Sequence, residues 1–378
     1  MTDKKTTKKN SEPLFYITKR TNVSMKFAIM TRAIAVVSAF VIMSVLMTLL
    51  SKENPFTIIS SMFDGAFGTG LRTWVLFSDT AILLGISLAL TPAFKMKFWN
   101  CGGEGQVLIG ALISAMMMLF VGDKIPLALL IAFSAVLSTA IGAVWGLIPA
   151  VFKAKWNINE TLFTLMLNYI ATGLVSMFLT IWLKNGKTSL DPILAGNFPA
   201  VFGNRYILTV SVFFILAVLM FVYLKYTKHG YEIAVVGDSP NTAKYIGIDV
   251  KRVIIRTMIM SGALAGLVGL FLAGGINHTI ATDSANNMGF TAIMATWLAA
   301  FNPLVMMGTC LFIIFISRGM VEVRGDFGFT NDSIANIVIG LVYFCVIACS
   351  FFITYRVVFR KASTKTTEID GTKGETKA

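Results

Sequence analysis

The chain of 378 residues is too apolar to form an ordinary water-soluble protein. Hydrophobic residues make up 56% of it and charged residues only 13%, against about 25% charged residues in a typical soluble domain. So few polar side chains cannot cover a water-exposed surface, and a disordered chain would need the opposite balance. The composition predicts an all-α protein that crosses the membrane several times.

The charge is strongly positive but is not distributed as in a nucleic-acid-binding protein. The 32 Lys and Arg residues outnumber the 19 Asp and Glu residues, which leaves a net charge of +13. Many of the basic residues lie in the two polar tails, without the interleaved aromatic side chains that stack on bases. The four cysteines lie in or beside apolar stretches and lack the spacing of zinc ligands. We therefore expect neither nucleic acid nor a metal as a partner.

Ten apolar stretches are candidates for membrane spans, since a span needs about 20 residues. Seven approach that length and three, the third, eighth and ninth, are shorter. In chain order they are residues 28–50, 74–92, 107–121, 126–151, 162–183, 206–224, 253–276, 288–301, 303–317 and 333–355.

The basic residues predict how this chain is oriented. If both termini are cytoplasmic, the inner segments hold 22 Lys and Arg and the outer loops hold 8, while Arg32 and Arg256 lie inside spans. Cytoplasmic segments carry the excess of basic residues in membrane proteins. The prediction is a multi-pass cell-membrane protein with a cytoplasmic polar tail at 1–27, a transmembrane domain at 28–355 and a basic tail at 356–378.

Short segments occupy matching places in the two halves of the chain. Residues 107–121 and 288–301 are each the third span of a set of five, and polar and glycine residues border both, at 100–106 before the first and at 286–289 and 302–303 around the second. Such segments in corresponding positions are typical of inverted repeats around a substrate path. We therefore predict two five-helix halves related as an inverted repeat.

Six polar or aromatic residues in or near the spans are candidates for the substrate path. Glu104 could line the path or anchor a helix end among glycine amides, because a buried carboxylate is costly and usually has a role. It could equally be an ordinary residue of a cytoplasmic loop, because the predicted topology places residues 93–104 inside. Asn168 is expected to make an interhelical hydrogen bond or to contact substrate, and Trp297 to pack or to form a platform. Asp79 is expected to pair with Arg72 or to reach the membrane surface. The candidates are Asn100, Glu104, Gln106, Asn168, Trp297 and Asn302.

The cytoplasmic loop 225–252 contains a predicted short helix. Ser239 followed by Pro240 is a typical helix start, and Gly247 can end the helix after about two turns. An isolated helix of this length is unstable in water, so it must pack on its own membrane domain or on a partner. Its apolar residues favour a partner. They are Ala243, Tyr245, Ile246 and Ile248.

The order and spacing of several motifs resemble those of ABC-importer permeases for simple sugars and nucleosides. The segment Asn100-Cys-Gly-Gly-Glu-Gly-Gln106 is similar to their N-I-G-A-E-G-Q element, and 159–169 is similar to their next signature. Residues 237–247 with 261–269 resemble their coupling region and the helix after it, and 289–303 resembles their eighth segment. Cys101 and Ala292 depart from the expected isoleucine and glycine, which leaves the substrate open.

This resemblance implies a non-catalytic permease subunit of a type II importer. ATP and magnesium would bind a separate ATPase, since this chain has no phosphate-binding loop with the required glycine spacing. A second permease chain, identical or paralogous, would complete the pore, and an extracytoplasmic binding protein would deliver a nucleoside or a simple sugar. The implied ATPase-coupling residues are Gly237, Asp238, Ser239, Pro240, Ala243, Tyr245, Ile246 and Gly247.

Three other functions are alternatives to this one. A permease for branched-chain amino acids has a related topology. A secondary transporter that works alone would need a coupling-ion site, and the membrane acids here are few. A membrane transferase would display paired acids at the membrane face, whereas Asp326 and Asp332 lie on the predicted outer side.

Overall fold

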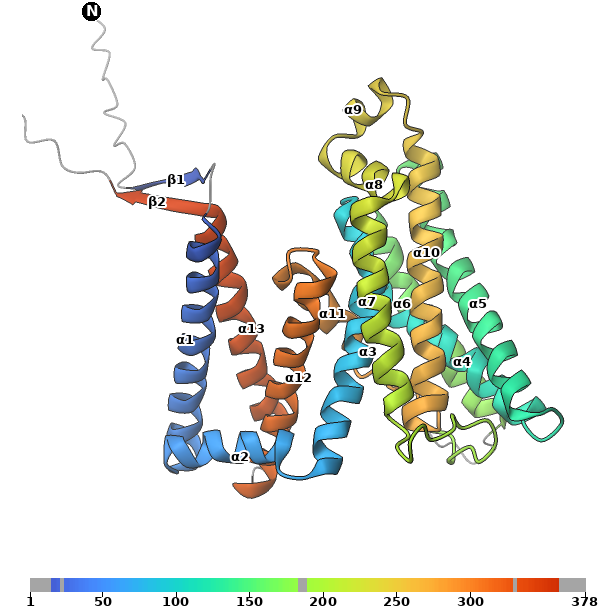
Figure 1. Cartoon of the computed structure of the whole chain (residues 1–378), viewed down its shortest axis with the longest axis horizontal. Coiled ribbons are helices and arrows are strands. Elements are labelled where there is room, and N and C mark those ends of the chain that lie inside the picture. The colour runs from blue at the N-terminus through green and yellow to red at the C-terminus, as the bar shows by residue number, and fades with distance from the viewer. Residues whose placement is uncertain (1–14, 21–23, 183–188, 329–331, 360–378) are drawn as a thin grey trace, which may run out of the picture. The chain divides into compact units, whose positions relative to one another are not determined.

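The computed structural model describes residues 15–20, 24–182, 189–328 and 332–359. This described part contains thirteen α-helices, one π-helix and two short strands (Figure 1). It divides into two compact units, one of residues 42–343 and one formed by the residues before and after it. Most of both predicted tails, residues 1–14 and 360–378, lies outside the described residues.

The terminal unit contains a two-stranded ribbon that the sequence analysis did not predict. Strand β1 (Phe15–Lys19) pairs antiparallel with β2 (Tyr355–Phe359), with Ile17 opposite Val357. Both strands are rich in aromatic and β-branched residues, which favour strands. Because α1 (Met25–Ser51) follows β1 and α13 (Asp332–Thr354) precedes β2, the pairing brings the start of one helix and the end of the other together. An even number of crossings would produce this arrangement.

Within the described residues, seven helices are long and apolar enough to cross a membrane. They reproduce seven of the predicted spans with shifted boundaries, while the total of ten crossings and the inverted repeat stay predictions. The seven are α3 (Gly70–Lys95), α4 (Gly103–Val121), α5 (Leu127–Trp156), α6 (Glu160–Trp182), α7 (Ile207–Tyr226), α10 (Val250–Leu270) with its π-helical continuation η1 (Phe271–Asn277), and α12 (Pro303–Asp326).

Several boundaries were predicted wrongly. The ninth span was expected to be short, yet α12 has 24 residues, because its charged last turns pair with neighbouring helices instead of ending it. Helix α2 (Pro55–Phe67) lies where a loop was expected; Asn54 caps it by accepting a hydrogen bond from the Phe56 N–H. The eighth segment is short as predicted, since α11 (Met288–Leu298) has 11 residues.

Glycines at GxxxG spacing, which is typical of closely packed membrane helices, bring α5 and α10 into backbone contact. A Cβ atom added to Gly142 would overlap the carbonyl oxygen of Gly262, and one added to Gly266 would overlap that of Ser138. Helix α4 joins the pair through Gly110, whose Cβ would overlap Gly266. The three helices therefore form a closely packed core of the larger unit.

Ion pairs connect α12 to its neighbours near the α2 end of the same unit. The buried carboxylate of Asp79 on α3 pairs with Arg318 of α12, so its predicted pairing with Arg72 is wrong. Arg72 instead pairs with Glu322 at 2.7 Å. Sequence separation hid these partners, because they lie about 240 residues apart and meet only when α12 packs on α3.

Candidate functional site

The predicted short helix of loop 225–252 is present and projects from the larger unit. Helix α9 (Pro240–Tyr245) follows α8 (Lys228–Asp238), and both lie beyond the end of α7 (Figure 1). The Ser239 hydroxyl accepts a hydrogen bond from the Thr242 N–H at 3.2 Å, as expected of a helix cap. Gly247 adopts a φ of +83°, which ends the helix as predicted.

The face that α9 turns outward is smaller than the sequence predicted. Tyr245 is 93% exposed and Ile246 is 54% exposed. Ala243 is fully buried, so the prediction that it adds apolar surface is wrong. So short a helix is unstable without packing partners, and in this chain α9 contacts α8 and α10.

Gly237 serves as a packing residue between α8 and α3. It is buried, and a Cβ atom there would overlap the carbonyl oxygen of Lys95 at the last residue of α3. Asp238 and Pro240 are exposed, and Ser239 is half-buried. Within the predicted coupling segment, Gly237 and Ala243 thus hold it to the bundle while the other residues face outward.

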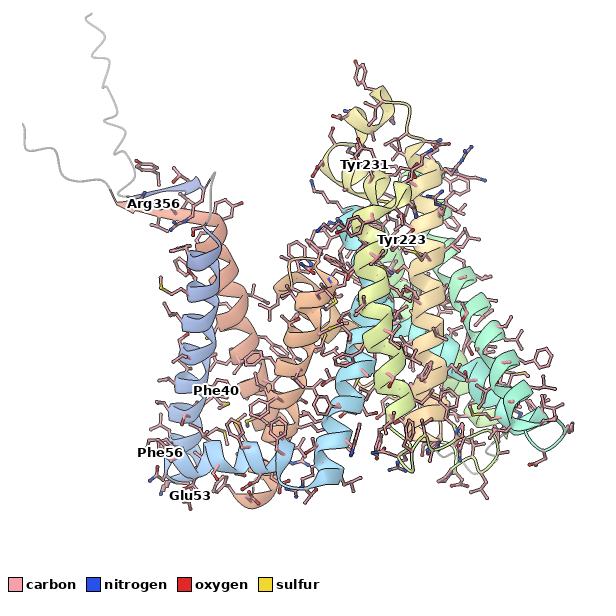
Figure 2. The ribbon with its side chains drawn as sticks, in the orientation of Figure 1. Phe40, Glu53, Phe56, Tyr223, Tyr231 and Arg356 are labelled. Atoms are coloured by element: carbon pink, nitrogen blue, oxygen red, sulfur yellow. The ribbon has the colours of Figure 1, made fainter. Side chains whose placement is uncertain are left out.

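A buried histidine fastens α8 to the spans beneath it. His229 Nδ1 bonds to the Tyr223 hydroxyl, and its Nε2 lies 3.3 Å from the Thr257 hydroxyl. Figure 2 labels Tyr223 at the end of α7 and Tyr231 on α8. Burial, aided by the charge of Arg256, lowers the pKa of His229 to about 4, against an opposing effect of Glu232. The imidazole is therefore neutral near pH 7, and sequence analysis missed its role because its partners are distant in the chain.

The turn before α4 lies inside the helix bundle. Asn100 bonds to Ser261, eleven residues into α10, which is about 16 Å from the start of that helix. Gly105 donates its N–H to Asn168, eight residues into α6. Non-helical backbone at such depth needs protein partners in place of water, and the asparagines supply them.

Three of the candidate path residues form this buried polar cluster. Asn100 donates to Gln106 at 3.3 Å and accepts from the Gly102 N–H at 3.0 Å. Asn168 also donates to the Cys101 carbonyl at 2.9 Å. Its acceptance of the Gly105 N–H of α4 confirms the predicted interhelical hydrogen bond. These three side chains join α4, α6 and α10, and whether they also contact substrate stays a prediction.

Glu104 connects the N-termini of two helices. It lies in the first turn of α4, and its carboxylate accepts the backbone N–H groups of Asn287 at 3.0 Å and Gly289 at 2.6 Å. These groups begin α11, so the predicted helix-end anchor among glycine amides is confirmed. A carboxylate is stabilised at a helix N-terminus by the helix dipole and by unpaired N–H groups, and here two such termini meet on it.

Trp297 and Asn302 lie at the other end of α11. Trp297 is 46% exposed and stacks on Trp99, with ring centroids 5.4 Å apart and planes 20° apart. Asn302 caps α12 by accepting a hydrogen bond from the Leu304 N–H at 3.1 Å. Asn302 therefore has a structural role, and nearly half of the Trp297 surface is exposed.

The described residues contain no group of three His, Cys, Asp or Glu side chains able to hold a metal ion. The polar groups described above are either paired within the helix bundle or lie on the exposed face around α9. The paired groups within the bundle can transmit motion between helices, and the exposed groups can bind a partner or a solute.

Sequence comparison identifies the class of membrane protein. Residues 71–356 match the family described as branched-chain amino acid transport system / permease component. The chain belongs to this family. It is thus a multi-pass, non-catalytic permease of an ABC importer, as the motifs indicated.

The relatives of this permease are named for different solutes. It is 28% identical to the nucleoside ABC transporter permease protein NupB of Lactococcus lactis subsp. cremoris, over 90% of this chain and 96% of that protein. It is 27% identical to the guanosine ABC transporter permease protein NupP of Bacillus subtilis, over 70% and 78%. It is 28% identical to the glucose ABC transporter permease protein TsgB13 of Haloferax volcanii, over 76% and 78%. No solved structure matches the chain significantly.

Proposed function

We propose that this permease imports nucleosides, driven by a separate ATPase subunit that binds ATP and magnesium. The main support is the similarity to the nucleoside permease NupB along nearly the whole of both chains. The exposed tryptophan face at the end of α11 supports the same solute class, because base rings stack on aromatic side chains. A simple sugar is the second candidate, favoured by the relative named for glucose.

Helix α9 is the proposed contact with the ATPase. Tyr245 and Ile246 form its exposed apolar face, and large buried apolar or aromatic side chains contribute most of the energy of protein interfaces. A cleft of the ATPase would enclose this face, beside Asp238, Ser239, Pro240 and Gly247.

The packing beneath α9 would carry the motion of the ATPase into the spans. Gly237 fits α8 directly against the end of α3, His229 holds α8 to α7 and α10, and α9 leads into α10. Interfaces packed this closely move as bodies instead of deforming. Closure of the ATPase would therefore shift α3 and α10 together and alternate the access of the path.

The proposed path involves α4, α11 and the residues that position them. Asn100, Gln106 and Asn168 would hold the turn before α4, while Glu104 would hold α11 against it. Trp297 would present its exposed ring to the solute, and Asn302 would fix the bend between α11 and α12.

The remaining partners and the orientation follow the family. A second permease chain, identical or paralogous, would complete the pore, and an extracytoplasmic binding protein would deliver the solute. Both termini and α9 would be cytoplasmic in the cell membrane, in agreement with the excess of basic residues on that side.

The substrate is tested with the assembled transporter in membrane vesicles. ATP-dependent uptake of labelled guanosine, glucose and leucine is measured with the binding protein present. We expect uptake of guanosine, which unlabelled uridine or adenosine would reduce. Uptake of glucose or leucine alone would contradict the proposal, and solute accumulation by this chain without an ATPase would identify a secondary transporter.

The coupling role of α9 is tested by a charge on its exposed face. Tyr245→Asp should abolish co-purification of the ATPase, because a carboxylate would be buried in an apolar contact. Leu194→Asp is the matched control, since Leu194 is 91% exposed and lies in a predicted outer loop. ATPase retention by the Tyr245 variant, or equal loss in the control, would contradict the assignment. Ala243 is unsuitable for this test because it is buried.

A further inference from the structure

A pocket of about 290 Å³ lies where the end of α3, the turn before α4, the end of α8 and α11 come together. Aromatic rings line it together with charged side chains. The residues used in the argument below are Phe94, Lys97, Trp99, Asp238, Trp297 and Phe301. We call this site the aromatic pocket.

The four rings of the aromatic pocket form a continuous row. Trp99 and Trp297 are stacked at its centre, and each is less than half exposed, at 43% and 46%. Phe94 meets Trp99 edge-on, with centroids 6.0 Å apart, and Phe301 meets Trp297 edge-on at 5.3 Å. Edge-on neighbours fix the orientation of the two indoles, so both rings are already ordered where they line the pocket.

The aromatic rings suit the base of a nucleoside, and the charged groups of the pocket suit its ribose hydroxyls and the polar atoms of the base. Asp238 is exposed at the last residue of α8, and a carboxylate accepts hydrogen bonds from two adjacent hydroxyl groups. Lys97 is exposed at the pocket and can donate to a carbonyl oxygen or ring nitrogen of a base. A ligand with one flat aromatic part and one part rich in hydroxyl groups matches both sets of groups.

A row of tryptophans could also belong to the aromatic belt that many membrane proteins place at the membrane surface. Belt residues are distributed around a protein, whereas these four rings share one pocket with an ammonium group and a carboxylate. The pocket also lies against Gly237, in the segment that leads into α9. Its position therefore connects ligand binding with the proposed ATPase contact.

We propose that the aromatic pocket is a binding site for a nucleoside within the permease itself, with the base on the Trp297–Trp99 pair and the ribose hydroxyls on Asp238. The inference rests on the proposed function and adds a site for the solute in this chain. On the predicted topology, the nucleoside would bind here last, before its release into the cytoplasm.

Binding is tested with the transporter assembled from permease and ATPase, without the binding protein, in lipid nanodiscs. Equilibrium dialysis with labelled guanosine gives the dissociation constant. Trp297→Leu should raise it at least tenfold and Trp297→Phe less than threefold, because phenylalanine keeps a stacking face. Asp238→Asn should weaken guanosine but leave 2′,3′-dideoxyguanosine unchanged. Trp156→Leu is the control, since that tryptophan is 61% exposed on α5 and outside the pocket.

A second measurement needs no variant. Guanosine should quench the tryptophan fluorescence of the unaltered complex, and ribose at the same concentration should not. Equal effects of ribose and guanosine, or an unchanged dissociation constant in the Trp297→Leu complex, would overturn the inference. Nucleoside uptake by vesicles is measured separately, so import without binding at this pocket would refute the site and leave the proposed function standing.

Discussion

The carboxylate of Glu104 lies 2.6 Å from the backbone nitrogen of Gly289, a residue 185 positions later in the chain. Gly289 has no room for a side chain, because a Cβ atom there would overlap the backbone of Glu104. The acidic side chain in the first turn of α4 thus accepts unpaired N–H groups at the start of α11. The contact is the direct connection between α4 and the short helix α11, both elements of the proposed path.

Removal of this carboxylate should loosen the start of α11. Hydrogen bonds to a charged acceptor contribute about 1.5–3 kcal/mol each, and 1.4 kcal/mol corresponds to a factor of ten. Glu104→Ala should therefore speed hydrogen exchange of the Asn287 and Gly289 amides at least about tenfold and impair uptake by the assembled complex. Glu104→Gln, which keeps one acceptor, should have an intermediate effect.

The control for Glu104 is another glutamate in the first turn of a helix. Glu160 begins α6 and pairs with Lys153 at 2.8 Å. Glu160→Gln should leave exchange at 287–289 unchanged. The anchor hypothesis fails if those amides exchange at the same rate with and without the Glu104 carboxylate.

The glycine contact between α5 and α10 should not tolerate a methyl group. Gly142→Ala forces Cβ into the Gly262 carbonyl, and overpacking typically costs about 1–3 kcal/mol. The thermal midpoint of the purified complex should therefore fall. Gly173 on α6 is the matched control, since its Cβ would meet nothing within 4 Å; Gly173→Ala should preserve the midpoint or raise it slightly. Equal midpoints for the two variants would contradict the packing argument.

The buried carboxylate of Asp79 should depend on its partner Arg318. Arg318→Ala leaves the buried Asp79 carboxylate without its partner, and because Arg318 is itself 41% exposed, the cost should lie below the roughly 3–5 kcal/mol of a fully buried pair. Adding Asp79→Asn should restore most of the lost thermal stability. Arg72→Ala removes a more exposed pair with Glu322, where both side chains reach solvent, and should cost about 0–1 kcal/mol. Equal melting temperatures of the Arg318→Ala and Arg72→Ala variants would show that the Asp79–Arg318 pair is unimportant.

Acidic pH should destabilise the junction of α8 through His229. The pKa of this histidine in the folded protein is about 4, below the usual 6.5, so the unfolded chain binds a proton first as the pH falls. The stabilising effect is complete above pH 6.5 and is lost progressively between 6.5 and 4. Partial solvent screening limits the loss from pH 7 to pH 5 to about 1 kcal/mol.

The variant His229→Asn isolates this effect. Asparagine can still bond to Tyr223 and Thr257 but does not titrate. The difference in melting temperature between the wild type and this variant should shrink as the pH falls from 7 to 5. A difference that stays constant over this range would show that His229 does not titrate as described.

The membrane class and most helices followed from the sequence because burial in lipid demands long apolar segments whatever their neighbours. The helix at Ser239 and Pro240 was also predictable, since a helix cap acts within a few residues. The strands β1 and β2 were missed because each is short and pairs with the other end of the chain.

Only the tertiary structure decided what the polar residues do. The partners of Asp79, Glu104 and His229 come from other helices, so nothing in the local sequence could identify them. The burial of Ala243 and the stacking of Trp99 on Trp297 likewise depend on how helices pack. Local physical rules specify helices from short-range sequence, whereas a buried polar group is satisfied by whichever distant group the packed bundle brings within hydrogen-bonding distance.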